Sequence, residues 1–279
     1  MPLAQQGKQC LLRCFWQSGH RQSGEYQQTG SYREQGTAAY HRQSGSMMFK
    51  QIIIVLGLCF SLAACATEPK ISYFSWRYGT GSNIDSFCTT KATFYHKGET
   101  VFSYPGGGCN AGVPYKSIID KKYYWSGGGG LPTEGVPVPD KASIEMVSFY
   151  DRKRYRIRVN LPADLVQQMQ QRYHVKGRID QRNWLYFGLA PGGYYEVLLF
   201  GDLLGVSPDR LLARGIAEEV TDDWYDKKVS VARQYGIDEF DKKYGELFKQ
   251  HPIPSGMDWA PIMDAYRANQ PKTDQHPVK

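Results

Sequence analysis

Residues 184–200 read Trp-Leu-Tyr-Phe-Gly-Leu-Ala-Pro-Gly-Gly-Tyr-Tyr-Glu-Val-Leu-Leu-Phe, two apolar runs rich in aromatic residues with Pro-Gly-Gly between them. Such runs are typical of β-strands. Pro191 followed by Gly192 suits a type II turn, in which glycine supplies a positive φ. The stretch therefore predicts a β-hairpin. Because neighbouring strand residues point to opposite faces, Tyr194 and Tyr195 cannot both be buried on one face.

The chain before the hairpin is predicted to be rich in strands, because β-branched and aromatic residues stand between Gly, Asn and Asp breaks. The strands are expected at residues 71–78, 92–96, 100–104, 143–150 and 152–160. In the last of these, apolar residues alternate with arginines, as in Tyr155-Arg156-Ile157-Arg158-Val159. A period of two predicts a half-buried strand with one cationic face.

Helical patterns follow. Pro162 precedes apolar residues at helical spacing, from Leu165 to Tyr173, which predicts an amphipathic helix. From Ser207 onwards the chain is predicted to be helical, with Ser207 as the N-cap and Pro208 at the first helical position. The residues expected to face inward in that first helix are Leu211, Leu212, Ile216 and Val220. Further helices are expected at residues 224–235, 240–248 and 260–266.

Strands first and helices later, without βαβ alternation, predict an α+β fold. The sheet is expected to be antiparallel in a β-rich N-terminal part, with helices concentrated in the C-terminal part of a single domain. The domain is expected over residues 71–268, and the polar residues 269–279 are expected to form a flexible tail.

A leader precedes this domain. Residues 48–64 combine Lys50 with an apolar run of 13 residues, which is typical of a secretory signal peptide and shorter than the roughly 20 residues of a membrane-spanning helix. The end, Leu62-Ala63-Ala64-Cys65, resembles the bacterial lipobox. That resemblance implies cleavage before Cys65 and lipidation of Cys65, with residues 65–70 as a tether. Ala66, rather than Asp, follows Cys65. By the lipoprotein sorting rule of enteric bacteria, which this tether resembles, that residue implies an outer-membrane lipoprotein, and an orientation facing the periplasm is the default expectation.

Residues 1–47 are unusual ahead of a signal peptide. They are polar and repeat Gln-Ser-Gly and Gln-Thr-Gly triplets, so they bury too little apolar surface to fold alone. They are either a disordered extension or the product of a start assigned too far upstream. Signal recognition near the true N-terminus favours the second interpretation, with Met47 or Met48 as the start.

Cleavage before Cys65 would leave a mature chain of 215 residues, and its charge and cysteine content differ from those of the full sequence. Residues 1–64 hold six basic and two acidic side chains, so the net charge of +7 falls to +3 in the mature chain. Without a basic cluster interleaved with stacking aromatics, nucleic-acid binding is not expected. Cys88 and Cys109 remain once Cys65 is lipidated. In an oxidising compartment they are candidates for a disulfide, and the alternative is two buried thiols.

Residues 141–217 resemble a family of Gram-negative lipoproteins, domain of unknown function family 2931. The matching features are the strand end Ser148-Phe149-Tyr150, the step Val159-Asn160-Leu161-Pro162, and above all the hairpin segment at residues 187–193. Members are envelope lipoproteins, some of them encoded beside lipase effectors of type VI secretion. The resemblance implies an immunity protein that neutralises a secreted phospholipase in the periplasm. It brings no catalytic motif with it.

The sequence assigns no catalytic residue, cofactor or metal ligand. The mature chain has no Gly-x-Ser-x-Gly elbow and no Gly-Lys-Ser/Thr phosphate loop. Its histidines lack a second ligand at helical spacing. The chain is therefore not expected to be an enzyme.

Aromatic side chains are the candidates for partner binding, since Tyr and Trp give large contact areas with a polar end. The expected exposed aromatics are Tyr123, Tyr124, Trp125, Tyr194 and Tyr195. The first hypothesis is a membrane-anchored protein that occludes a lipase effector with these residues. The alternative is a glycan- or peptidoglycan-binding lipoprotein that stacks sugars on them.

Overall fold

The computed structural model describes residues 74–84, 86–106, 108–110, 113–126, 128, 135–203, 206–221, 229–273 and 276–278. All of them belong to one compact unit, residues 68–279. The segment 1–47, the signal peptide predicted at 48–64, Cys65 and the tether at 65–70 lie outside the described residues.

The predicted hairpin is present. Strands β9 (Trp184–Ala190) and β10 (Tyr194–Phe200) pair antiparallel and are joined by a short 3-10 turn, Pro191–Gly193. Gly192 has φ 77° and ψ 16°, the values required at the third position of a type II turn. A Cβ on Gly192 would also collide with the backbone of Gly256. The turn is tied to the neighbouring sheet, because the Gly192 amide donates to the Asp151 carboxylate at 2.9 Å.

The hairpin forms the centre of a four-stranded sheet with the order β1-β9-β10-β11. Strand β1 (Arg77–Ser82) runs parallel to β9, and β11 (Arg210–Ile216) runs antiparallel to β10. A six-stranded antiparallel sheet faces it. That sheet has the order β12-β6-β5-β2-β3, with β4 also paired to β2. Its strands are β2 (Phe87–His96), β3 (Glu99–Pro105), β4 (Cys109–Asn110), β5 (Lys141–Ser148), β6 (Lys153–Asn160) and β12 (Glu218–Glu219).

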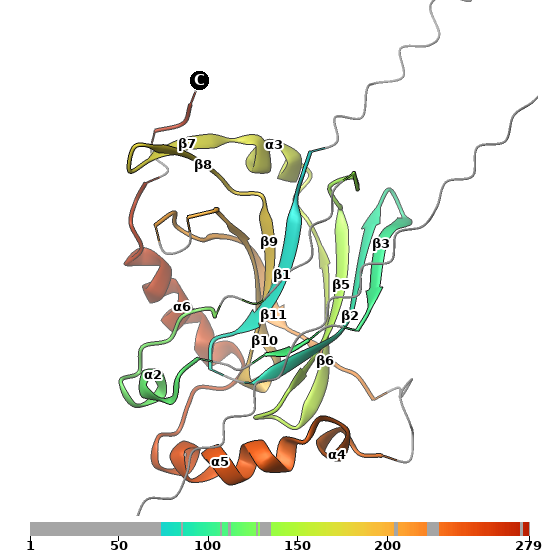
Figure 1. Ribbon diagram of the computed structural model, residues 1–279, viewed down its shortest axis with the longest axis vertical. Helices are drawn as coiled ribbons and strands as arrows, with labels where there is room; N and C mark the ends of the chain where they lie inside the picture. The colour runs from blue at the N-terminus through green and yellow to red at the C-terminus, as the bar shows by residue number, and fades with distance from the viewer. Residues whose placement is uncertain are drawn as a thin grey trace, which may run out of the picture. The chain divides into compact units, whose positions relative to one another are not determined.

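The two sheets enclose the main core (Figure 1). Inward residues such as Phe187 and Val197 of the four-stranded sheet meet Phe94, Ile144 and Ile157 of the six-stranded sheet. The opposite face of β9 and β10 is also covered, by α2 (Tyr115–Ile119) and α6 (Trp259–Ala268), and the 3-10 turn Gly256–Asp258 lies against the turn of the hairpin. The central hairpin is therefore apolar on both sides.

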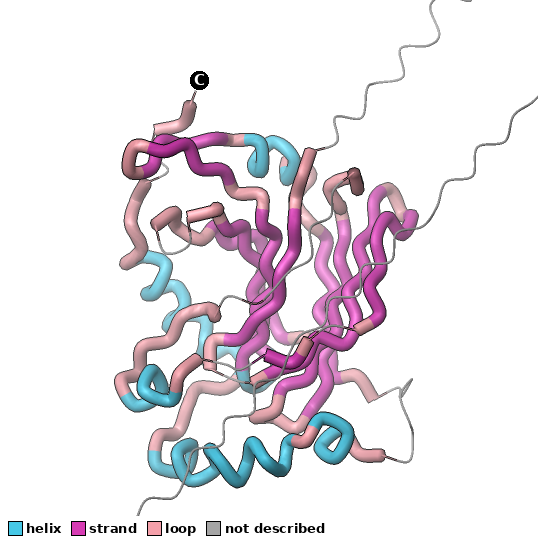
Figure 2. Tube along the Cα trace, in the orientation of Figure 1, coloured by secondary structure: helices cyan, strands magenta, loops and turns pink. Residues whose placement is uncertain are grey.

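The remaining elements lie at the ends of the sheets (Figure 2). Helices α4 (Val231–Tyr235) and α5 (Ile237–Gln250) pack Ile237 against Cys88 and Val147, covering one end of the outer face of the six-stranded sheet. A short helix, α3 (Leu165–Gln170), precedes the two-stranded ribbon of β7 (Arg172–Val175) and β8 (Arg178–Gln181). The fold is α+β with helices concentrated towards the C-terminus, as predicted.

The helix predicted from Ser207 is wrong. Residues 210–216 form strand β11, and residues 218 and 219 form β12. Leu211, Leu212 and Ile216 fit a helical period by spacing alone, but the open edge of β10 supplies backbone partners that an isolated helix would lack. Val220, which was assigned to the helix interior, instead donates its amide to Arg154 O at 2.8 Å.

Backbone hydrogen bonds connect described residues of the C-terminal segment to the β7–β8 ribbon. His174 donates its amide to His276 O at 3.3 Å, and Val278 donates its amide to Arg172 O at 2.9 Å. These bonds extend the β7–β8 ribbon, with Tyr173 bridged to Pro277. The polar composition of the tail signals exposure but does not exclude pairing with an open strand edge.

Cys88 and Cys109 form a disulfide, the pairing that the sequence suggested. The two residues lie directly opposite each other on β2 and β4, with Cα atoms 4.0 Å apart. Because β4 has only two residues, the covalent link holds the segment after β3 against the sheet.

We predict that a Cys88→Ala/Cys109→Ala variant loses about 3 kcal/mol of unfolding free energy, because the bond closes a loop of 21 residues. Urea denaturation monitored by tryptophan fluorescence measures the change. The matched control is dithiothreitol, which should destabilise the parent chain by a similar amount and leave the double variant unchanged. Equal unfolding midpoints for parent and variant would contradict the prediction.

Candidate functional site

The aromatic candidates divide into buried and accessible side chains. Tyr123, Trp125 and Tyr194 are 9%, 5% and 0% exposed, so the expectation that they are exposed is wrong. Their rings fill the layer between the four-stranded sheet and α6. Tyr124 is 36% exposed, and Tyr195 is half-buried. Tyr194 and Tyr195 do lie on opposite faces, one in the helix-side cluster and the other against the core between the sheets.

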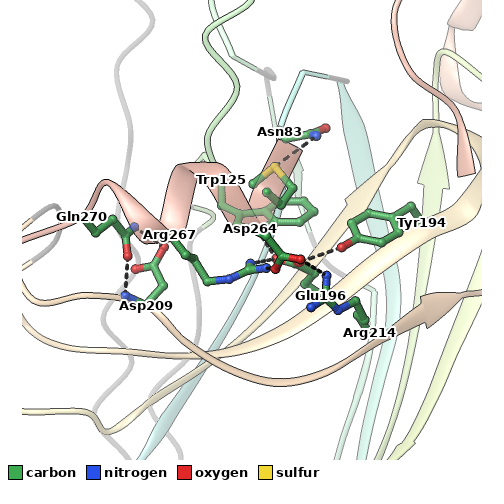
Figure 3. A network of polar contacts seen from close by, with 10 residues as sticks. Asn83, Trp125, Tyr194, Glu196, Asp209, Arg214, Asp264, Arg267 and Gln270 are labelled. Atoms are coloured by element: carbon green, nitrogen blue, oxygen red, sulfur yellow. Dashed lines mark hydrogen bonds and ion pairs between the residues drawn. The ribbon is translucent and has the colours of Figure 1, made fainter. Parts of the chain in front are cut away.

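A fully buried carboxylate, Glu196 on β10, organises the helix-side layer (Figure 3). Trp125 Nε1 donates to Glu196 Oε2 at 2.8 Å, and the Tyr194 hydroxyl donates to Glu196 Oε1 at 2.6 Å. Arg267 of α6 donates to Glu196 Oε2 as well. Burial, and then the bond to Glu196, raise the pKa of Tyr194 well above its usual value, so this hydroxyl stays a donor at physiological pH.

The network continues to the surface of α6. Arg267 Nη2 donates to Asp264 Oδ1 at 2.5 Å, and Arg214 Nη1 of β11 donates to Asp264 Oδ2 at 2.9 Å. Both oxygens of Glu196 are thus occupied and both arginines are neutralised. A fully buried carboxylate that accepts three hydrogen bonds in this way suits a structural role in fixing α6 against the sheet.

An open groove lies beside this network. Its volume is about 730 Å³, and it lies between α6 and the segment that follows α2. Its lining residues are Lys121, Lys122, Tyr123, Tyr124, Pro261, Ile262, Ala265, Tyr266, Asn269, Gln270 and Pro271. Among the described residues, the lining is mostly aromatic, apolar or proline, with two lysines and no acidic side chain. The groove brings together Tyr123 and Tyr124 but none of the other predicted aromatics.

A second carboxylate lies at one end of the groove lining. Asp209, which precedes β11, exchanges two hydrogen bonds of 2.7 Å with Gln270. Burial raises the pKa of Asp209 to about 6. Burial, followed by the nearby Asp209 charge, raises the pKa of Tyr266 to about 12. Gln270, in the groove wall, is therefore hydrogen-bonded to a carboxylate whose pKa is raised towards neutral pH.

The described residues show no metal site and no helix that could cross a bilayer. No three His, Cys, Asp or Glu side chains among them lie close enough to hold a metal ion. None of their helices combines the length and apolar character of a membrane span.

The family of the chain follows from its sequence. The model of the family described as "Protein of unknown function (DUF2931)" matches residues 63–256, which include both sheets and the central hairpin. The chain belongs to the DUF2931 family, as the resemblance indicated. Comparison with curated proteins and with solved structures finds no match.

Sequence reasoning missed the two carboxylates. The signal for Glu196 is one acidic residue inside an otherwise apolar strand, Tyr194–Phe200, because such a residue needs an internal partner if it is buried. Its partner Arg267 lies 71 residues later, and no local pattern connects the two. Asp209 resembled the start of a helix, and only the strand that replaces the helix shows its burial.

We predict that Glu196→Ala lowers the unfolding free energy by about 3–5 kcal/mol, since it leaves the buried Arg267 charge and the Trp125 N–H without an acceptor. Glu196→Gln should cost less because one acceptor oxygen remains. Glu219→Ala is the control, because its 2.7 Å ion pair with Lys153 is exposed to solvent, and exposed ion pairs contribute little to stability. Similar losses for Glu196→Ala and Glu219→Ala in urea denaturation would refute this.

Asp209 makes stability depend on pH in a defined direction. Its folded pKa, about 6, exceeds the ordinary 3.8, so the folded state binds the extra proton between these values and stability falls as pH rises through that window. We predict that Asp209→Asn matches the parent chain near pH 4 and exceeds it in stability by roughly 1–3 kcal/mol at pH 7. Thermal unfolding at half-unit pH intervals measures the difference.

Asp264→Asn provides a control of opposite sign. Bonding to Arg214 and Arg267 lowers the pKa of Asp264 despite its desolvation, so its contribution is present at neutral pH and lost as pH falls through the lowered value. This variant should be less stable than the parent chain at pH 7 and converge with it in acid. An Asp209→Asn advantage that is independent of pH would contradict the assignment.

Proposed function

We propose that this chain is a periplasm-facing, membrane-anchored lipoprotein that binds another protein through the groove beside α6. The partner is proposed to be a type VI secretion phospholipase effector, which the lipoprotein neutralises by occlusion. The observation that carries the proposal is the groove itself, where the exposed Tyr124 lies next to Lys121 and Lys122 and no acidic side chain is found among the described residues of the lining. The lysines favour a partner segment that is both acidic and apolar.

The groove has the composition of an interface centre. Tyrosine is enriched among residues that dominate binding energy, because it offers a large rigid ring with a polar end. Tyr123 packs edge-on against Trp259, with ring centroids 4.9 Å apart, which fixes the neighbouring backbone. The backbone that carries the exposed Tyr124 is therefore held in place by the packing of its neighbour Tyr123.

The support of α6 favours tight binding. The ion pair between Arg267 and the buried Glu196 ties the helix to the sheet, and the Trp259 Nε1 donates to Pro191 O at 3.2 Å. A surface that is already ordered loses little conformational entropy on association. Occlusion needs such a rigid surface, because it must stay seated over the mouth of the partner's active site.

Membrane anchoring completes the proposal and rests on the sequence. Lipidation of Cys65 would hold the protein at the bilayer that a phospholipase attacks. Several acyl chains anchor stably, whereas a single chain binds only marginally. The short predicted tether would keep the groove near that surface.

Glycan binding is the alternative use of the same groove. Tyr124 and Tyr266 line it, and tyrosine rings can stack on sugars. The pair of lysines favours an acidic partner over a neutral glycan, and the test below separates a protein from peptidoglycan, whose peptides also carry carboxylates.

We predict that the tagged fragment 66–279 recovers a phospholipase from envelope extract and inhibits it. Tyr124→Ala should weaken inhibition about 10- to 100-fold, the cost of removing a central aromatic contact, and Lys121→Glu/Lys122→Glu should weaken it further by reversing the charge. Tyr104→Ala on β3 is the matched control, since Tyr104 is 40% exposed and lies outside the groove lining.

Two outcomes would overturn the proposal. One is recovery of peptidoglycan fragments without a protein, which would assign the groove to glycans. The other is full inhibition of the lipase by a folded Tyr124→Ala variant, which would place the interface elsewhere.

A further inference from the structure

A small cationic cavity lies on the outer face of the six-stranded sheet, away from the groove beside α6. Its volume is about 270 Å³, and it opens over β2, β5 and β6. Lys91, Lys141, Arg156 and Arg158 give it positive charge, and Thr93 and Ser143 provide hydroxyl groups. Glu145 is the acidic residue of its lining.

The register of the strands arranges these side chains in rows. Lys91, Glu145 and Arg156 are direct neighbours across β2, β5 and β6, and Thr93, Ser143 and Arg158 form the next row. A register shift between Thr89 and Lys91 brings Lys91 onto this face. Without that bulge the lysine would point towards the core between the sheets.

Glu145 is the unexpected member of the site. Its side chain is only 5% exposed, and Arg156 Nε donates to its Oε1 at 2.8 Å. Its second oxygen, Oε2, is buried and has no hydrogen-bond partner among the described residues. Leaving a buried carboxylate oxygen unpaired costs free energy, so this oxygen marks a position where a ligand donor would be stabilised.

The cations around Glu145 have spare binding capacity. Lys91 makes no ion pair within the described part of the chain, and Lys141 lies over the Tyr95 ring at 5.8 Å. Arg158 pairs with Glu218 at 2.5 Å through one nitrogen, Nη1, and an arginine fork has further donors. The cavity therefore offers several donors to an anion and one buried acceptor to a cation or hydroxyl.

We propose that this cavity binds a phosphate group that carries a nearby ammonium, the chemistry of phosphoethanolamine. The phosphate would lie over Thr93 and Ser143, between Lys91, Lys141 and Arg158. The ammonium would pair with the Glu145 carboxylate in the adjacent row. Residues two apart on a strand are separated by about 7 Å, so a phosphate and an ammonium joined by two carbons can reach both rows.

The proposal does not depend on the protein partner, because the cavity and the groove lie on different sheets. The same ligand chemistry is available as a soluble metabolite or as the headgroup of phosphatidylethanolamine in a bilayer. The experiment therefore compares soluble probes first and membranes second.

The test uses the full chain in nanodiscs of phosphatidylcholine, titrated with phosphoethanolamine, inorganic phosphate and ethanolamine by calorimetry. Phosphoethanolamine should bind at least 10-fold more tightly than phosphate. Lys91→Ala should weaken binding of both phosphate compounds about 10-fold. Glu145→Gln should weaken phosphoethanolamine binding about 10-fold but strengthen phosphate binding, because a negative charge is removed. Lys249→Ala, an exposed lysine of α5, controls for net charge.

The opposite signs expected for Glu145→Gln separate ligand contact from damage to the fold, which would weaken both ligands together. Equal loss of both, or equal affinity of the parent chain for phosphate and phosphoethanolamine, would overturn the proposal. In nanodiscs that contain phosphatidylethanolamine, weaker apparent binding of the soluble probe would support the headgroup as the source. Unchanged binding would support a soluble ligand of the same chemistry.

Discussion

The central hairpin of β9 and β10 is buried on both faces, and the rest of the structure depends on that constraint. One face meets the six-stranded sheet through Phe187 and Val197, and the other meets α2 and α6 through Tyr186 and Leu198. A strand pair in this position must be apolar on both sides. The one carboxylate it carries, Glu196, is satisfied by three donors from three different segments. The helix layer is positioned by that requirement.

Close backbone approach makes the arrangement possible. A Cβ on Gly188 would come within 2.5 Å of the Trp125 ring, so glycine lets the indole approach β9 closely enough for its Nε1 to reach Glu196. Trp125, which the sequence indicated as an exposed binding residue, is consequently part of the support for its neighbour Tyr124. The accessible aromatic surface is smaller than composition suggested: of the five candidate aromatics, Tyr124 is the one that is exposed, and it lines the groove.

The sequence predicts those features of the fold that depend on a local pattern of residues. The hairpin follows from its Pro-Gly turn, and the cationic outer face follows from the alternation of arginines along β6. The residues of β11 predict a helix because their apolar spacing fits a helical repeat. Only the pairing with β10 shows that they form a strand. The bulge that turns Lys91 outward is a single extra residue, which leaves no trace in composition. The pairing of Glu196 with Arg267 is likewise invisible until α6 is placed.

The same contrast separates the two candidate sites. The groove is defined by tertiary packing, because Tyr124 and Tyr266 come from segments that only the helix layer brings together. The cavity on the outer sheet is defined by strand register, because Lys91, Glu145 and Arg156 occupy one row across three strands. The positions of these residues are held by the hydrogen bonds between the strands of the six-stranded sheet. The groove therefore depends on the placement of α6 over the hairpin, whereas the rows of the cavity depend on the pairing of β2, β5 and β6.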